Sequence, residues 1–190
     1  MLGTEAFWVN ESELRREDHL IKILAPPQTD LFCGLDGTVV DNAPLYGVEI
    51  EGDCVIEAKV SFTKSGNYDG AGLVLYGDRQ HWAKTCLEAT DFGKIAVISV
   101  ITNEVSDDAN GPHITQDSVW LRLVRKGDAC SIHYSLDGVH YEMHRICRVA
   151  LPRKIMAALI AQAPVGDGIT CTFEEVKVEQ VTVENLRNGA

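Results

Sequence analysis

The chain has 190 residues, of which 45% are hydrophobic and 24% charged, and its 28 acidic against 17 basic side chains give a formal net charge of −11. This length and composition are typical of one globular domain and argue against a disordered or fibrous chain. So much negative charge repels phosphate groups, and we therefore expect neither nucleic acid nor a membrane surface as a partner.

Two absences in the sequence narrow the class of protein further. The N-terminal stretch "MLGTEAFWVNESELRRED" has no basic region followed by an apolar one, and no later stretch approaches the ~18 apolar residues of a spanning helix. We therefore expect a cytoplasmic protein. The six cysteines lie far apart with no C-x-x-C pair. This spacing predicts free thiols, several of them on the core faces of strands, and no zinc or redox motif.

The elements predicted along the chain are almost all short strands. Only "ESELRRED" (11–18) has a helical pattern. Strands are expected at 19–25, 53–62, 71–76, 81–88, 94–102, 119–126, 129–135, 139–147, 154–161 and 169–183, separated by turn sequences such as "SGNYDG", "TDFGK" and "LDG". This spacing predicts an all-β sandwich or barrel. We expect one domain over 1–183, followed by a polar C-terminal tail, 184–190, without fixed structure.

The segment "HWAKTCLE" (81–88) has an unusual polar face for a predicted strand. Strand alternation places Ala83, Thr85 and Leu87 on a face that suits a core, and the opposite face then carries Trp82, Lys84, Cys86 and Glu88. Lys84 and Glu88 lie ~13 Å apart along such a strand, so they are not expected to pair directly unless both side chains reach a shared ligand.

Residues 119–147 are expected to form a three-stranded meander closed by two tight turns. If Gly127-Asp128 closes the first hairpin, Arg122 lies opposite His133, and if Asp137-Gly138 closes the second, His133 lies opposite Glu142. These three residues would then form a row across the sheet at about 5 Å intervals. The row is either a binding surface or a solvated sheet face with a cross-strand ion pair. The predicted polar face carries Trp120, Arg122, Ser131, His133, Ser135, His140, Glu142 and His144, and the predicted core face carries Leu121, Leu123, Ile132, Tyr134, Tyr141 and Met143.

Three segments together carry a family resemblance: "YDGAGLVLYGDRQHWAKTCLE", "ISVITNEVSD" and "VWLRLVRKGDACSIHYSLDGVHYEMHRI". With its W-x-K-x-x-x-E and V-x-T-N-x-x-S-D motifs, the chain resembles domain-of-unknown-function family thirteen forty-nine, which includes the regulation-of-enolase-like proteins of the concanavalin A-like lectin/glucanase superfamily. The likeness runs from Trp8 to about Phe173. It implies a two-sheet antiparallel jelly-roll sandwich with a concave sheet, and no established reaction. Where the family usually has Trp after the Ser-Asp pair, this chain has Asp108, so a stacking aromatic is missing there.

The concave sheet implied by the resemblance is the expected ligand site. A sugar needs an aromatic plane for its C–H face and fixed polar groups for its hydroxyls. Trp82 is the candidate plane, and charged or amide side chains would supply the hydrogen bonds. We expect a carbohydrate or sugar-related metabolite to bind through Trp82, Lys84, Glu88, Asn103, Arg122 and His133.

Two other classes of function remain open. A glycoside hydrolase would need two carboxylates about 5 Å apart, and because the strand of Glu88 offers no second one, Glu142 is the candidate partner. A sugar lyase or isomerase would use His133 as its base and Arg122 to neutralise a substrate carboxylate. The candidate catalytic residues are therefore Glu88, His133 and Glu142. The third class is a regulatory module that receives a protein on the concave face, which would need an apolar patch on the order of 800 Å².

Metal binding has two weaker candidates in the sequence. His140, Glu142 and His144 alternate on a predicted strand and could present ligands to Zn²⁺. The oxygen-rich loop "NEVSDDANG" (103–111) could hold Ca²⁺. Metal-free surface histidines and a plain polar loop are the simpler interpretations, and we expect no metal and no cofactor. The sequence leaves open whether the protein is a monomer or a homodimer.

Overall fold

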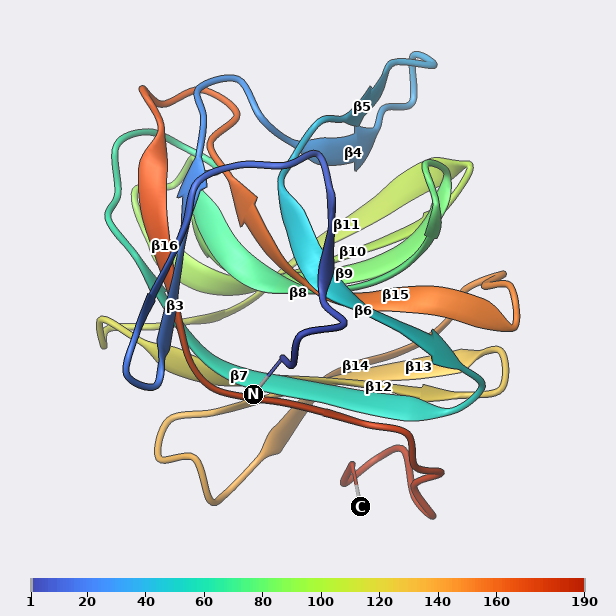
Figure 1. Cartoon of the computed structure of the whole chain (residues 1–190). Helices are drawn as coiled ribbons and strands as arrows, with labels where there is room; N and C mark the ends of the chain where they lie inside the picture. Colours follow the sequence, from blue (N-terminus) through green and yellow to red (C-terminus); the bar gives the residue numbers. More distant parts are fainter. Residues whose placement is uncertain (1, 190) are drawn as a thin grey trace.

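Two antiparallel seven-stranded sheets pack face to face (Figure 1). The computed structural model describes residues 2–189, and Met1 and Ala190, the outer ends of the predicted domain and tail, lie outside them. Sheet A has the strand order β1 (Phe7–Val9), β6 (Leu45–Glu51), β15 (Lys154–Gln162), β8 (Gly70–Asp78), β9 (His81–Ala89), β10 (Ile95–Asn103) and β11 (Val105–His113). Sheet B has the order β14 (Glu142–Arg148), β13 (Ala129–Ser135), β12 (Val119–Lys126), β7 (Cys54–Phe62), β16 (Ile169–Glu179), β3 (Leu20–Ala25) and β2 (Leu14–Glu17). The predicted jelly-roll sandwich is confirmed.

Alternating apolar residues build the main core, which lies between the sheets. On β7 the side chains of Cys54, Ile56, Ala58 and Val60 are buried, while the residues between them are partly exposed. They join a cluster that draws on both sheets, to which β9 contributes Ala83 and Leu87. The predicted core face of β9 is therefore confirmed.

Sheet A is buried on its second face as well. Figure 1 shows its strands curving, with the concave side toward a small ribbon of β4 (Leu31–Cys33) and β5 (Val39–Asp41). Beneath this ribbon a second apolar cluster contains Leu31, Val74, Trp82, Ile98 and Ile160, four of them from neighbouring strands of sheet A. Burial on both faces explains the nearly continuous apolar runs of β8, β10 and β15.

Two segments differ in type from their prediction. Residues 11–18, expected as a helix, contain the strand β2, which pairs with β3. The loop expected at 103–111 is largely β11, which pairs with β10 at the edge of sheet A. Both are edge strands, which need backbone partners on one side only, so polar side chains suffice and the apolar pattern is weak. The strands predicted elsewhere are present, although β14 begins at Glu142 and not at 139, and β16 ends at Glu179 and not at 183. The strands β1, β4, β5 and β6 were not predicted.

The two turns of the 119–147 meander give opposite outcomes. The first closes as predicted and sets Arg122 opposite His133. The second is a longer loop, because Asp137 Oδ1 accepts hydrogen bonds from the N–H groups of Val139 and His140, both at 2.8 Å, and holds the chain out of a two-residue turn. His133 therefore lies opposite Met143, and a register shift follows along β14. The predicted row of Arg122, His133 and Glu142 is wrong.

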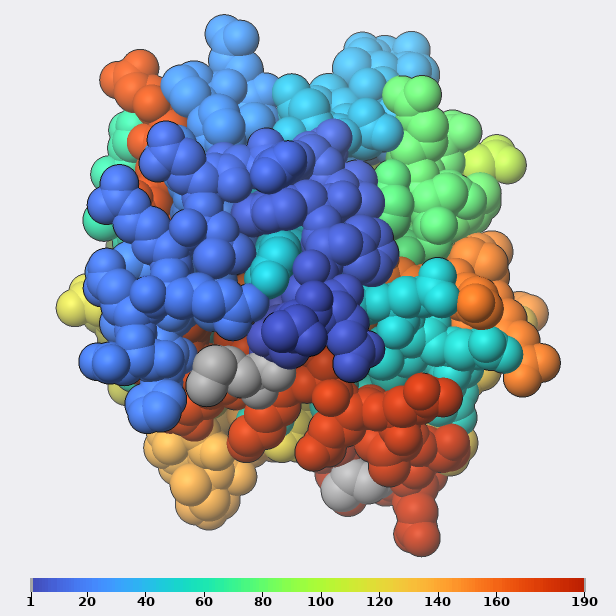
Figure 2. All heavy atoms as spheres, viewed as in Figure 1, coloured from blue at the N-terminus to red at the C-terminus, as the bar shows by residue number. Residues whose placement is uncertain are grey.

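The last described residues lie against the outer face of sheet B. A turn forms there, in which the Gly189 N–H donates to the Asn185 carbonyl at 3.0 Å, and Gly189 itself is buried. Figure 2 shows these C-terminal residues (red) packed below the N-terminal segment (blue). Residues 184–189, predicted to lack fixed structure, are thus folded onto the sandwich.

All six cysteines are free, as predicted, and five of them are buried. Residues 2–189 contain no helix that is long and apolar enough to cross a membrane.

Candidate functional site

A buried lysine lies at the centre of the concave face of sheet A. The Lys84 side chain on β9 is 1% exposed, and its Nζ donates hydrogen bonds to the Leu31 carbonyl at 2.8 Å and to Gln162 Oε1 at 2.9 Å. Asp30 Oδ1 lies 3.6 Å from the same nitrogen. Because Leu31 belongs to β4 and Gln162 to β15, this one ammonium ties the ribbon to the sheet.

The amide of Gln162 links Lys84 to Glu88. Its Nε2 donates to Glu88 Oε2 at 3.1 Å and to the Tyr68 carbonyl at 3.0 Å. Glu88, only 7% exposed, thus joins the Lys84 network through a shared partner. The absence of a direct Lys84–Glu88 pair agrees with the strand geometry predicted from the sequence.

Glycine on the intervening strand makes this link geometrically feasible. Gly70 of β8 is paired with Glu88 on one side and with Gln162 on the other. A Cβ at Gly70 would lie 3.3 Å from Glu88 Cγ and 3.1 Å from the Leu87 carbonyl oxygen, a tight fit that would push the carboxylate aside. With no side chain between them, Glu88 and Gln162 meet above the middle strand.

A pocket of about 280 Å³ opens above this network. It is lined by Lys84, Glu88 and Gln162, and by two aromatic residues, Phe32 of β4 and Tyr68 of the turn before β8. Tyr68 is 40% exposed and has a φ of 64°, a left-handed conformation that is uncommon for a bulky residue. The remaining lining residues are Asp30, Val100 and Asp108.

The charges around the pocket shift the pKa values of its groups. The pKa of Glu88 is raised to about 8, chiefly by burial; Lys84 lowers it, and the nearby Asp108, Asp30 and Asp69 add to the increase. Burial alone would lower the Lys84 pKa, but the surrounding carboxylates outweigh it and leave that pKa raised. At neutral pH the pocket therefore holds a charged lysine and a largely protonated Glu88.

Trp82 does not serve as the open aromatic plane predicted for it. Its ring is 0% exposed and packs beneath the β4–β5 ribbon, with Lys84 Nζ 5.5 Å from the ring centroid. The ribbon, whose presence the sequence did not reveal, covers the face on which a sugar would have stacked. The aromatic side chains that do reach the pocket are Phe32 and Tyr68.

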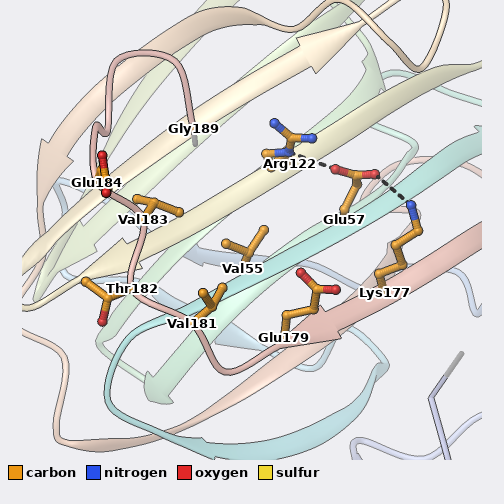
Figure 3. A pocket seen from close by; sticks show the side chains of 10 residues that line it. All are labelled: Val55, Glu57, Arg122, Lys177, Glu179, Val181, Thr182, Val183, Glu184 and Gly189. Atoms are coloured by element: carbon orange, nitrogen blue, oxygen red, sulfur yellow. Dashed lines mark hydrogen bonds and ion pairs between the residues drawn. The ribbon is translucent and has the colours of Figure 1, made fainter.

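Arg122 and His133 lie on the other sheet, far from this pocket in the fold. On the outer face of sheet B, Arg122 Nε lies 2.7 Å from Glu57 Oε2, and Lys177 Nζ lies 3.6 Å from Glu57 Oε1 (Figure 3). The Arg122 guanidinium also lies 3.6 Å from the centroid of the Tyr141 ring. A cavity of about 450 Å³ separates this row from Val181, Val183 and Glu184 of the C-terminal segment.

His133 is covered by the same C-terminal segment. It is completely buried, and burial lowers its pKa although the nearby backbone of Leu186 and Arg187 raises it. A side chain sealed in this way cannot reach a substrate on the concave face of sheet A.

Asn103 occupies a third location and links the two sheets. At the end of β10, its Oδ1 accepts from the Ala150 N–H at 2.8 Å and its Nδ2 donates to the Arg148 carbonyl at 3.3 Å. The six residues predicted to bind one ligand are thus spread over three places. Only Lys84 and Glu88 line the same pocket.

The predicted catalytic and metal-binding residues are also separated. Glu142 Oε2 accepts a hydrogen bond from the Tyr134 hydroxyl at 2.6 Å, so it faces neither Glu88 nor His133. A ring nitrogen of His140 lies 2.8 Å from Asp137 Oδ2, and His144 Nε2 lies 3.0 Å from Ser99 Oγ. In the part of the chain that the structure describes, no group of three or more His, Cys, Asp or Glu is arranged to hold a metal ion.

Six lining residues were not predicted from the sequence as part of a site: Asp30, Phe32, Tyr68, Val100, Asp108 and Gln162. One signal was present, since Asp108 is the residue that replaces the expected Trp after the Ser-Asp pair. Gln162, a polar residue ending an apolar strand, was a second. The others follow from which segments fold over the sheet, and no local pattern marks them.

Comparison with known proteins finds relatives by sequence and solved structures that share the fold. "Regulation of enolase protein 1" of Saccharomyces cerevisiae is 26% identical over 140 residues, which cover 73% of this chain and 70% of that protein. The crystal structure of a functionally unknown Saccharomyces cerevisiae protein has a TM-score of 0.87 at 22% identity and covers 95% of this chain and 98% of that one. A Bacillus subtilis carbohydrate-binding module, CBM66, has a TM-score of 0.58 at 14% identity, over 91% of this chain and 95% of that one. At these identities the solved structures share the fold.

The family relationship extends over almost the whole sandwich. The model of the family described as "Protein of unknown function (DUF1349)" matches residues 8–181, and the chain belongs to this family.

Proposed function

We propose that the protein binds a carbohydrate or sugar-related metabolite in the pocket on the concave face of sheet A. The observation that carries the proposal is the combination of two aromatic side chains, Phe32 and Tyr68, with the carboxyl groups of Glu88 and Asp108 around one opening. Aromatic faces pack against sugar C–H groups, and carboxyl groups hold hydroxyls with directional hydrogen bonds.

The pocket is held in place before any ligand arrives. Lys84, Gln162 and Glu88 are fixed by buried hydrogen bonds to three different segments of the chain. A preorganised site loses little conformational entropy on binding. The shared fold of a carbohydrate-binding module supports the proposal at the level of architecture only.

Substitution at the pocket is expected to weaken saccharide binding. Asp108→Ala removes one charged hydrogen-bond acceptor, and since such a bond contributes ~1.5 kcal/mol or more, the affinity should fall about tenfold or more. Tyr68→Ala should have a similar effect through lost stacking. The measurement is isothermal titration calorimetry, after a thermal-shift screen of neutral mono- and oligosaccharides.

The matched control is Glu142→Gln, which alters an exposed carboxylate of sheet B. It should bind as the parent does. A screen in which no saccharide stabilises the parent protein would contradict the proposal, and so would an Asp108→Ala variant with unchanged affinity.

Glycoside hydrolysis is a second candidate, favoured by one observation. Glu88, with a pKa of about 8, is a protonated acid at neutral pH and shares its pocket with the carboxyl group of Asp108. A proton-donating acid beside a second carboxyl group is the pairing that glycosidases use. Chromatography of the saccharides that bind, after prolonged incubation, would reveal cleavage, and Glu88→Gln should abolish it while binding persists.

A further inference from the structure

The hydrogen-bonding capacity of the pocket can be counted group by group. The Lys84 ammonium has three N–H donors. Two hydrogen bonds are formed, to the Leu31 carbonyl and to Gln162 Oε1, and Asp30 Oδ1 lies 3.6 Å away, at ion-pair distance. The side chain is also 1% exposed. Lys84 therefore gives a ligand little access to its remaining N–H, which lies beside Asp30, although it is the only cationic side chain that lines the pocket among the described residues.

The amide of Gln162 already forms hydrogen bonds within the protein through both its nitrogen and its oxygen. Its two N–H groups donate to the Tyr68 carbonyl and to Glu88 Oε2, while its oxygen accepts from Lys84. The Trp82 indole N–H has no partner among the described residues, but Trp82 lies outside the pocket lining. The Tyr68 hydroxyl and the proton of Glu88 are then the donors that remain.

Free acceptors, in contrast, are plentiful. Asp30 Oδ2 accepts no hydrogen bond from the described residues, and the Asp108 carboxyl group accepts one from the Ala109 backbone. A ligand that satisfies this pocket must bring donors of its own. Sugar hydroxyls do so, and a protonated amine does so with a favourable charge.

The pocket also resists additional negative charge. The pKa of Glu88 agrees with this, because burial and the carboxylates of Asp108, Asp30 and Asp69 raise it to about 8 despite the nearby Lys84, and a raised pKa means that the negatively charged form is disfavoured. A phosphate or carboxylate brought into the same space would meet the same loss of solvation and the same repulsion.

We propose that this pocket selects ligands that donate hydrogen bonds and carry no negative charge. Amine-bearing sugars bind most tightly, neutral sugars bind less tightly, and sugar acids and sugar phosphates are rejected. This inference rests on the proposed saccharide site, and it assigns Lys84 to the support of the pocket and not to the recognition of an anion.

The test compares matched ligand series by calorimetry at pH 7. For each of glucose, galactose and mannose, the neutral sugar is measured beside its 2-amino, uronic acid and 6-phosphate derivatives. In each series that binds, we expect the amine to bind at least tenfold more tightly than the acid and the phosphate, with the neutral sugar between them. Asp108→Asn should reduce the ratio of affinities between the amine and the acid or phosphate severalfold, whereas the Glu142→Gln control should leave this ratio unchanged.

The possible failures can be told apart. If an acid or phosphate binds as tightly as its neutral parent, the charge selection is wrong and the saccharide site stands. If a range of affinities appears but Asp108→Asn leaves it unchanged, the selection does not arise in this pocket and the inference fails. If no member of any series binds, both the inference and the proposed function are overturned.

Discussion

Replacing Lys84 with methionine is expected to lower the free energy of unfolding by about 3–5 kcal/mol, the usual effect of breaking a buried ion pair. Methionine fills a similar volume but leaves the Leu31 carbonyl and Gln162 Oε1 without their donor. It also leaves the Asp30 carboxylate, 3.6 Å from the ammonium in the parent, without a compensating charge. Urea unfolding of the two proteins at pH 7 measures the difference.

An exposed lysine provides the control for this prediction. Lys154 pairs with Glu49 at 3.0 Å, but both side chains are 61% exposed, so Lys154→Met should change stability by less than about 1 kcal/mol. Adding Glu88→Gln to Lys84→Met should recover part of the loss, because it removes a buried acid that must take up a proton to fold at pH 7. Equal effects of the two lysine substitutions would show that the ammonium does not organise the concave face.

Stability should fall as the pH rises from about 5 to 8, and Glu88 should be the cause. The folded protein raises the pKa of this acid from 4.5 to about 8, so in this interval the folded state keeps a proton that the unfolded state has released. Such a group favours folding at low pH, and its contribution is lost as the pH climbs through the interval, by up to about 1.4 kcal/mol per pH unit. The side chains that set this pKa are Lys84, Asp108, Asp30 and Asp69.

Glu88→Gln should remove most of this slope. The free energy of unfolding is measured in urea at intervals from pH 5 to pH 9. The stability of the variant relative to the parent should increase up to about pH 8 and then stay constant, because above that pH Glu88 is ionised in both states of the parent. The lowered pKa of His133 acts in both proteins and cancels in the difference. The exposed Glu11→Gln serves as the control and should run parallel to the parent. Parallel curves for Glu88→Gln would mean that Glu88 ionises in the folded state as it does in the unfolded chain.

Local patterns predicted the parts of this fold that depend on neighbouring residues. Alternation assigned the two faces of β9 correctly, and the Gly127-Asp128 turn fixed the pairing of Arg122 with His133. The second hairpin failed because the Asp137 side chain competes for backbone N–H groups and lengthens the loop.

The candidate site could not be predicted in full, because it depends on long-range packing. Alternation tells which residues share a face, but not which sheet the strand joins or what covers it. The hydrogen-bond partners of Lys84 lie 53 and 78 residues away in the chain, and β9 and β12 belong to different sheets. The sequence patterns therefore predict one shared surface for Trp82 and Arg122, although the two residues lie in different sheets of the sandwich.

The glycine at position 70 has a consequence for how the sandwich assembles. Strands two places apart in a sheet are separated by ~9.5 Å and do not normally exchange side-chain contacts, yet Glu88 and Gln162 meet across Gly70. That contact exists only when three strands are aligned to the residue, since a slip of one position would turn Glu88 toward the core. A ligand that binds Glu88 thus binds only a sheet whose strands have the correct register. Its binding would therefore stabilise that register over slipped alternatives while the chain folds.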